Sequence, residues 1–235
     1  MNIKNQVILK KPIAHRGLHD GNLSIPENTL LAFEKAIEKK LPIELDVQII
    51  KDGTLIIFHD TNLIRCCKRR IRIENLTYTA LKGFTIFNSK YTIPTLKEVL
   101  KLVDGSVPIL IDIKNYTIQK RLEKTLLVEL ENYKGFIMLQ SFNPFTVNWL
   151  KTHTSYATGY LVSKYNYLHF FNYFLMEMKN PIDFLSVDKR FVSSKYFKNL
   201  SKKNIPVLLW TLNEINEIYT LKDSYDNYIF ENFIP

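Results

Sequence analysis

Two acidic side chains, Glu44 and Asp46, lie two residues apart in a short apolar segment. Because side chains alternate between the two faces of a strand, a strand here would present both carboxylates on one face, near its end. Oxygen ligands of this kind suit a hard divalent cation such as Mg²⁺ or Ca²⁺. The same alternation is also typical of a wet edge strand, so the pair alone leaves a metal site and a solvated edge open.

A hairpin should bring His59 to this acidic pair. Leu55–Phe58 is strand-like but follows Val47–Ile50 after only four residues, which is too short for a parallel crossover. Asp52-Gly53 is a type I′ turn signal, and with these two residues as the loop the numbers of each opposed pair sum to 105. Asp46 then faces His59, with the two Cβ atoms about 4.5–5.5 Å apart.

These residue types suit the cleavage of a phosphodiester, which is a poor electrophile. Its cleavage needs positive charge on the phosphate and proton transfer at both ends. Arg16 could grip a phosphate through two parallel hydrogen bonds, and a cation on the acidic pair would add charge. His15 and His59, with an unperturbed pKa of about 6.5, can give and take protons near neutral pH.

A second pair of charged residues, Asp112 and Lys114, alternates at the end of another apolar run. The pair offers one anion for a cation and one cation for a phosphate, although a solvated strand end explains it equally well. The remaining histidines, His19, His153 and His169, belong to no motif, and we expect them to be ordinary surface or core residues.

The elements that would position these residues alternate between short apolar runs and helix-length amphipathic stretches, a βαβ pattern. Strands are expected at Pro12–His15, Pro42–Asp46, Val107–Ile113, Phe136–Gln140, Tyr156–Leu161, Phe184–Val187, Pro206–Trp210 and Tyr228–Phe230. Helices are expected at about 28–40, 95–104, 118–133, 143–152, 166–178, 193–203 and 214–222. Eight strands with helical crossovers predict an α/β fold, a single TIM-type (β/α)8 barrel whose chemistry lies at the C-terminal strand ends. An open doubly wound sheet would need a glycine-rich phosphate loop that is missing after the first strand.

The whole chain, residues 1–235, is expected to form this one domain, because its length is normal for such a barrel. Residues 61–94 are basic and contain no clear barrel element, so we expect a small insertion there, over the barrel mouth. The aromatic segment 166–178 is expected to pack on the barrel wall in preference to lying on lipid.

The composition is that of a globular protein, with 46% apolar residues and a net charge of +9. The charge is spread along the chain without zinc-finger spacing or an aromatic RNA-binding motif, so we expect no nucleic-acid partner. No apolar run is typical of a secretory signal or a membrane span, which predicts a cytoplasmic protein. Contact with a membrane surface stays open. The adjacent Cys66 and Cys67 are expected to be reduced thiols.

Short motifs follow one another along nearly the whole chain. They are His15-Arg16-Gly17, Pro26-Glu27-Asn28-Thr29, Ala32-Phe33, Glu44-Leu45-Asp46-Val47, Lys51-Asp52-Gly53, His59-Asp60, Ile93-Pro94-Thr95-Leu96, Ile111-Asp112-Ile113-Lys114, Gln140-Ser141-Phe142 and Trp210-Thr211-Leu212-Asn213. In this order and spacing the chain resembles the glycerophosphodiester phosphodiesterase family. The resemblance implies a metal-dependent barrel that cleaves glycerophosphodiesters to glycerol 3-phosphate and an alcohol.

The resemblance also implies a role for each motif residue. His15 and His59 would be the acid/base pair, Glu44, Asp46 and Asp112 the metal ligands, and Arg16 and Lys114 the phosphate contacts. The family usually has Glu where this chain has Asp112, and the shorter side chain would bind through water or draw the ion toward its strand. Glu231 departs from the commoner Thr-Asp pattern of the final strand, and no role is assigned to it.

Several alternatives stay open at this point. Asn28 is expected to cap the first barrel helix. Trp210 would wall a glycerol pocket or fill the barrel core. The other functions to weigh are a phospholipase-like phosphodiesterase acting on lysophospholipid or phosphoinositide head groups, and a non-catalytic binding protein. The preferred ion, the alcohol, the order of the two histidines, the attacking oxygen (water or a glycerol hydroxyl) and the oligomeric state are not determined.

Overall fold

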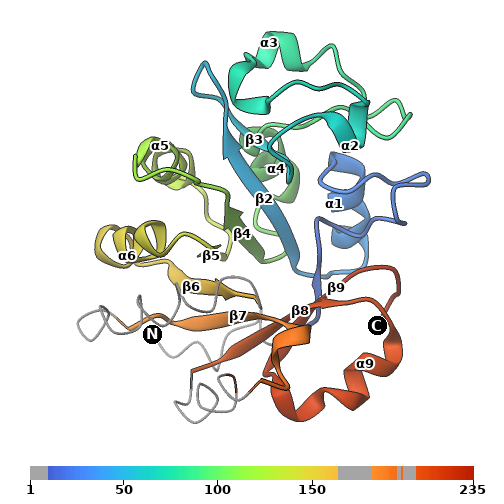
Figure 1. The fold of residues 1–235 in the computed structure, drawn as a ribbon. Helices are drawn as coiled ribbons and strands as arrows, with labels where there is room; N and C mark the ends of the chain where they lie inside the picture. Colours follow the sequence, from blue (N-terminus) through green and yellow to red (C-terminus); the bar gives the residue numbers. More distant parts are fainter. Residues whose placement is uncertain (1–9, 164–180, 195–196, 198–204) are drawn as a thin grey trace.

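Eight parallel strands close into a barrel in the computed structural model, which describes residues 10–163, 181–194, 197 and 205–235 (Figure 1). The strands are β1 (Ile13–Ala14), β2 (Ile43–Ile49), β4 (Ile109–Ile113), β5 (Ile137–Ser141), β6 (Ala157–Val162), β7 (Phe184–Asp188), β8 (Val207–Leu212) and β9 (Asn227–Phe230). Each pairs with the next in this order. The first strand closes the ring because it pairs in parallel with both β2 and β9. The predicted (β/α)8 barrel is therefore confirmed.

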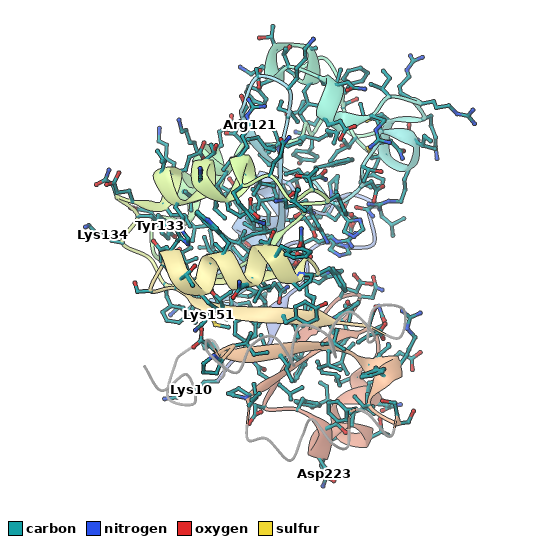
Figure 2. The ribbon with its side chains drawn as sticks, turned by 60° about the vertical axis from the view of Figure 1, so that its left-hand side comes forward. Lys10, Arg121, Tyr133, Lys134, Lys151 and Asp223 are labelled. Atoms are coloured by element: carbon teal, nitrogen blue, oxygen red, sulfur yellow. The ribbon has the colours of Figure 1, made fainter. Side chains whose placement is uncertain are left out.

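Helices connect the strands on the outside of the barrel. They are α1 (Leu30–Glu38), α4 (Leu96–Val103), α5 (Arg121–Leu130), α6 (Pro144–His153) and α9 (Ile215–Thr220), with the short 3-10 turns η4 (Lys189–Phe191) and η6 (Lys222–Ser224). Figure 2 shows α5 and α6 side by side on the outer wall, with Lys151 on α6. The predicted helix at 166–178 lies outside the described residues, as does most of the one at 193–203. None of the helices in the described ranges combines the length and apolar character that crossing a bilayer requires.

The interior of the barrel changes from apolar to polar toward the C-terminal strand ends. A buried cluster joins Leu110, Met138 and Leu208 from three different strands. Two residues farther along the same strands, and so on the same face, come Asp112, Gln140 and Trp210. This one-sided change is why the polar side chains gather at the mouth of the barrel, where TIM barrels carry their sites.

The strand β3 (Leu55–Ile57) returns antiparallel to β2, as the short connection predicts, but the predicted register is wrong by one residue. Ile50 N–H donates to Thr54 O (3.1 Å), so the loop holds three residues rather than two. Gly53, with φ of +92°, takes the left-handed position that ends such a loop. Asp46 consequently faces Phe58, whose N–H donates to Asp46 O (2.9 Å), and not His59.

The segment predicted as an insertion contains three short helical turns, α2 (Ile64–Cys67), η3 (Ile73–Asn75) and α3 (Tyr78–Leu81). It packs around a small apolar cluster that it shares with the β2–β3 hairpin, since this cluster joins Leu63, Ile73 and Ile86 to Ile56. In Figure 1 it lies at the top, beside the hairpin of β2 and β3 and next to α1. Cys66 and Cys67 are free thiols within it.

Candidate functional site

Three carboxylates converge at the mouth of the barrel, as the sequence predicts. Glu44 and Asp46 come from β2, and Asp112 lies directly beside Asp46 in the neighbouring strand β4. All three are buried, and one oxygen of each lies within 4.8 Å of the others. They line a cavity of about 160 Å³ whose walls also contain His15, Arg16, His59, Lys114, Gln140, Phe142, Leu161, Trp210, Thr211 and Ile229. We call this the site cavity.

Two cationic side chains contact the three carboxylates Glu44, Asp46 and Asp112, which we call the acidic cluster. Lys114 Nζ lies 2.9 Å from Asp46 Oδ1 and 2.5 Å from Asp112 Oδ2. Arg16 Nε lies 3.3 Å from Asp46 Oδ2, and the backbone N–H of Arg16 donates to Glu44 Oε2 (3.0 Å). Two positive charges thus face three carboxylates in a buried space.

Lys114 and Arg16 do not fully neutralise the three carboxylates, so a further cation could bind among them. Burial, reinforced by Asp46 and Asp112, raises the pKa of Glu44 well above its ordinary value, and burial also raises the pKa of Asp112. Burial would raise the pKa of Asp46 too, but Lys114 and Arg16 outweigh it and lower that pKa. Among the described residues, Asp112 Oδ1 has no hydrogen-bond partner. A buried, under-neutralised set of oxygen donors could hold a metal ion.

The loop after β1 aims its side chains through a tight turn. Arg16 and Gly17 have φ of +54° and +80°. A Cβ on Gly17 would lie 2.8 Å from the backbone of Ala32, so only glycine lets the loop approach α1 this closely. This turn sets His15 and Arg16 at the strand end, beside the carboxylates.

Asn28 is not the helix cap that the sequence predicts. The cap of α1 is Thr29, whose side chain accepts from Ala32 N–H. Asn28, one residue earlier, has a left-handed φ of +56°. The Asn28 side chain instead donates to Asp46 Oδ2 (2.8 Å), and its backbone N–H donates to Arg16 O (2.8 Å). Asn28 therefore ties the loop after β1 to the acidic cluster.

Glu27 joins Arg16 to the segment that follows β3. Arg16 Nη1 donates to Glu27 Oε1 (2.6 Å), and Arg65 donates to both oxygens of Glu27 (2.7 and 2.9 Å). Arg65 Nε also donates to Asp60 Oδ2 (2.7 Å). Burial would raise the pKa of Glu27, but Arg65 and Arg16 outweigh it and lower that pKa to about 2. The carboxylate therefore bridges two regions of the site.

His15 is held by a residue to which the sequence analysis gives no role, Glu231. The Nδ1 atom of His15 lies 2.6 Å from Glu231 Oε2, while its Nε2 lies 4.0 Å from Glu44 Oε2. Asn213 Nδ2 donates to the other Glu231 oxygen (2.7 Å). Burial lowers the pKa of His15. Burial would raise the pKa of Glu231, but His15 and His19 together outweigh it and lower that pKa. His19 Nε2 lies 3.6 Å from Glu231, beyond hydrogen-bond distance.

Barrel closure is the signal that could have located Glu231. Because β1 pairs with β9 through Ala14 and Phe230, the residues that follow these two strands lie side by side. The backbone N–H of His15 donates to Phe230 O (3.0 Å), which fixes this neighbourhood. A predicted barrel thus predicts contact between the residue after its first strand and the residue after its last.

His59 reaches the site cavity from beyond the end of β3, where strand alternation no longer applies. Gln48 Nε2 donates to Phe58 O (2.6 Å) and to Asp60 O (2.9 Å), which holds the backbone on both sides of the histidine. His59 Nδ1 lies 2.7 Å from Asp60 Oδ1. The sequence places Asp60 in a motif but gives no role to it or to Gln48.

Other predicted positions fall as follows. Trp210 lines the site cavity, with Phe142 edge-on to it at 5.8 Å between ring centroids. His153 lies on α6 and stacks on Trp149, away from the site cavity, and His169 lies outside the described residues. The structure therefore brings together all of the residues proposed from the sequence and adds Glu231, Asp60, Asn28 and Gln140 to them.

Comparison with known proteins gives one consistent family. The model of the "Glycerophosphoryl diester phosphodiesterase family" matches residues 15–234. The chain is 42% identical over 116 residues to a glycerophosphodiester phosphodiesterase of Bacillus altitudinis, covering 46% of each chain. It is 32% identical over 150 residues to one of Caldanaerobacter subterraneus, covering 59% of this chain and 60% of the relative. These matches thus span between about half and three fifths of the curated relatives.

Solved structures match over a greater length. A glycerophosphodiester phosphodiesterase of Thermotoga maritima is 28% identical with a TM-score of 0.75, covering 94% of both chains. A phosphodiesterase of Oleispira antarctica, solved in complex with the product sn-glycerol-3-phosphate, is 21% identical with a TM-score of 0.78, covering 94% of this chain and 92% of that one. At this lower identity the second likeness concerns the fold alone.

Proposed function

We propose, since this chain belongs to the glycerophosphoryl diester phosphodiesterase family, that it hydrolyses glycerophosphodiesters to glycerol 3-phosphate and an alcohol. One observation carries the proposal: the acidic cluster, two histidines and two cations line the same cavity. The relatives named glycerophosphodiester phosphodiesterase, including the Thermotoga maritima protein matched over nearly its whole length, support the same reaction.

The proposed cofactor is one divalent cation, Mg²⁺ or Ca²⁺. Glu44, Asp46 and Asp112 would hold it, because their oxygens converge and one of them lacks a partner among the described residues. When bound, the ion supplies positive charge to the phosphate oxygens. Asn28 keeps Asp46 oriented through its side-chain amide.

Arg16 and Lys114 are proposed as the phosphate contacts. An ammonium group has three N–H donors, and Lys114 uses two of them on Asp46 and Asp112, which leaves one for a phosphate oxygen. Arg16 donates from Nη1 to Glu27, and its Nε lies 3.3 Å from Asp46 Oδ2 without donating a hydrogen bond to it, so its Nη2 can serve a second oxygen. These contacts would orient the diester for attack.

His15 and His59 are proposed to move the protons. Each has its Nδ1 beside a carboxylate, at 2.6 Å from Glu231 and 2.7 Å from Asp60. An ionised carboxylate keeps the proton on Nδ1, so Nε2 of each ring is left to exchange a proton with the substrate. One histidine takes the proton of the attacking oxygen, and the other protonates the leaving alkoxide.

The test is release of glycerol 3-phosphate from glycerophosphocholine by the purified chain. We expect product with Mg²⁺ or Ca²⁺, no product after chelation, and recovery when the ion is returned. Asp46→Asn should lower kcat/KM at least 100-fold, whereas Asp104→Asn, the same change at an exposed residue ending α4, should not. A wild-type chain that is inactive with both ions would contradict the proposal and favour a binding protein. Hydrolysis that chelation leaves unchanged would contradict the proposed metal cofactor.

A further inference from the structure

His19 lies in the loop after β1, four residues beyond His15, and its ring faces Glu231. Its side chain is 5% exposed, and its Nε2 lies 3.6 Å from Glu231 Oε2. Within the part of the chain that the structure describes, this nitrogen has no hydrogen-bond partner. Buried polar groups nearly always have one. The position of this nitrogen beside a carboxylate therefore points to an interaction for which the proposed acid/base pair does not account.

The other ring nitrogen of His19 determines where the ring carries its proton. Gly21 N–H donates to His19 Nδ1 (3.1 Å). A ring nitrogen that accepts a hydrogen bond carries no proton, so the neutral ring has its proton on Nε2, the atom beside Glu231. His15, His19 and Glu231 do offer ligand atoms within 4.8 Å of one another. A metal ion there would need an unprotonated Nε2, so this tautomer favours a hydrogen bond to Glu231 over a metal site.

Hydrogen bonds within the loop after β1 hold His19 in this place. The Asp20 carboxylate accepts from three backbone N–H groups, each at 2.9 Å, those of Leu23, Ser24 and Ile25. Asn22 Oδ1 accepts from Glu27 N–H (2.7 Å), which joins the loop to the carboxylate that binds Arg16. Because the loop is already ordered, a movement of about 0.5 Å would bring His19 Nε2 to hydrogen-bond distance from Glu231.

Glu231 is the carboxylate that such a hydrogen bond would fix, since its side chain is long and 23% exposed. Asn213 Nδ2 donates to its Oε1 (2.7 Å), and its Oε2 lies 2.6 Å from His15 Nδ1. Water competes for a carboxylate in such a position. We propose that His19 is a positioning residue, which donates Nε2–H to Glu231 Oε2 and thereby keeps this oxygen against His15 Nδ1. The inference rests on the proposed function, in which His15 moves a proton.

Two substitutions of His19 separate the roles of its two nitrogens. Gln places its amide group about where Nε2 lies and keeps a donor for Glu231, whereas Asn places its amide group about where Nδ1 lies and keeps an acceptor for Gly21. On glycerophosphocholine, His19→Asn should lower kcat about 3- to 10-fold with little change in KM, the effect of one lost hydrogen bond. His19→Gln should be the faster of the two variants. The reverse order would mean that His19 only shapes its loop, and it would overturn the proposal.

A double variant shows whether the effect of His19 passes through Glu231. In the Glu231→Gln background, His19→Asn should lower kcat no further, because the carboxylate that His19 positions is already gone. Losses that multiply in the double variant would overturn the proposal. His153→Asn, the same change on the outside of α6, should keep the wild-type rate. Circular dichroism would verify that each variant is folded.

NMR of the histidine ring nitrogens tests the contact without turnover. In the wild type, His19 should carry its proton on Nε2, and the Nδ1 proton signal of His15 should shift more in His19→Asn than in His19→Gln. A proton on Nδ1 of a neutral His19 would overturn the proposal, as would hydrolysis at the wild-type rate by His19→Asn. If the NMR results are as expected but glycerophosphocholine is not hydrolysed, the proposed function fails while the contact between His19 and Glu231 stands.

Discussion

The two histidines of the site make the same kind of hydrogen bond in two differently built regions. His15 is 16% exposed, and its carboxylate, Glu231, lies 216 residues away in the sequence. His59 is 37% exposed, and its carboxylate is the next residue, Asp60. The first pair exists only because the barrel closes; the second is formed by a local turn. One half of the site therefore depends on the whole fold and the other half on a few neighbouring residues.

The supports of the two pairs differ in the same way. Glu231 is held by Asn213, which follows β8, so the first pair joins the ends of three barrel strands. Asp60 is held by Arg65 from the segment after β3, at the exposed edge of the site. Water can reach the second pair more easily, and we expect it to substitute for a lost contact there.

The largest effects should come from removing either imidazole, which tests whether both regions serve the reaction. His15→Ala and His59→Ala should each lower kcat by about 10²- to 10⁴-fold, because each removes one proton transfer. His153→Ala, on the outside of α6, should keep wild-type rates. Steady-state kinetics on glycerophosphocholine decides. Full activity in either site variant would show that the two regions are not a catalytic pair.

A smaller effect should distinguish the two carboxylates. Glu231→Gln should lower kcat about 10- to 100-fold with little change in KM, because a buried imidazole loses the anion that orients it. Asp60→Asn should lower kcat less than tenfold, since the His59–Asp60 pair is more exposed. Glu231→Asp should restore part of the rate. Equal losses in Glu231→Gln and Asp60→Asn would remove the distinction between the buried pair and the local pair.

The third effect is on stability rather than on rate and concerns Glu27, which bridges the two regions through Arg16 and Arg65. Its pKa falls from 4.5 to about 2 in the folded chain, so its ionised form stabilises the fold above about pH 4.5 and this contribution disappears as the pH falls toward 2. Glu27→Gln should therefore lower the free energy of unfolding by about 3 kcal/mol at pH 7, with a shrinking difference from wild type below pH 5. Urea unfolding at several pH values measures this, and a difference independent of pH would contradict it.

The sequence predicts the barrel and the convergence of its site because both follow from strand ends. In a parallel barrel every strand ends at the same face, so Asp46 on one strand and Asp112 on the next must lie together once the strands are recognised. The motif spacing adds His15 and His59. Roles for these residues, and the expected cytoplasmic location, stay predictions.

The sequence does not predict features that depend on a loop being one residue longer or on a single backbone angle. The hairpin loop contains Lys51 as well as Asp52-Gly53, and this shift moves Asp46 opposite Phe58. Asn28 fits a helix cap by residue type, but its left-handed backbone frees its side chain for Asp46. The role of Glu231 was not predicted for another reason: its partner, His15, lies near the opposite end of the chain.

The most direct test titrates the metal-free chain with Ca²⁺ and with Mg²⁺ and measures binding by calorimetry. It asks whether the acidic cluster, which lines the same cavity as both histidines, holds a metal ion. We expect one ion per chain in the wild type and no binding in Asp46→Asn. Glu231→Gln should bind the ion as the wild type does, because Glu231 contacts His15 and none of the three carboxylates in the cluster. Failure of the wild type to bind either ion, or undiminished binding by Asp46→Asn, would contradict this account.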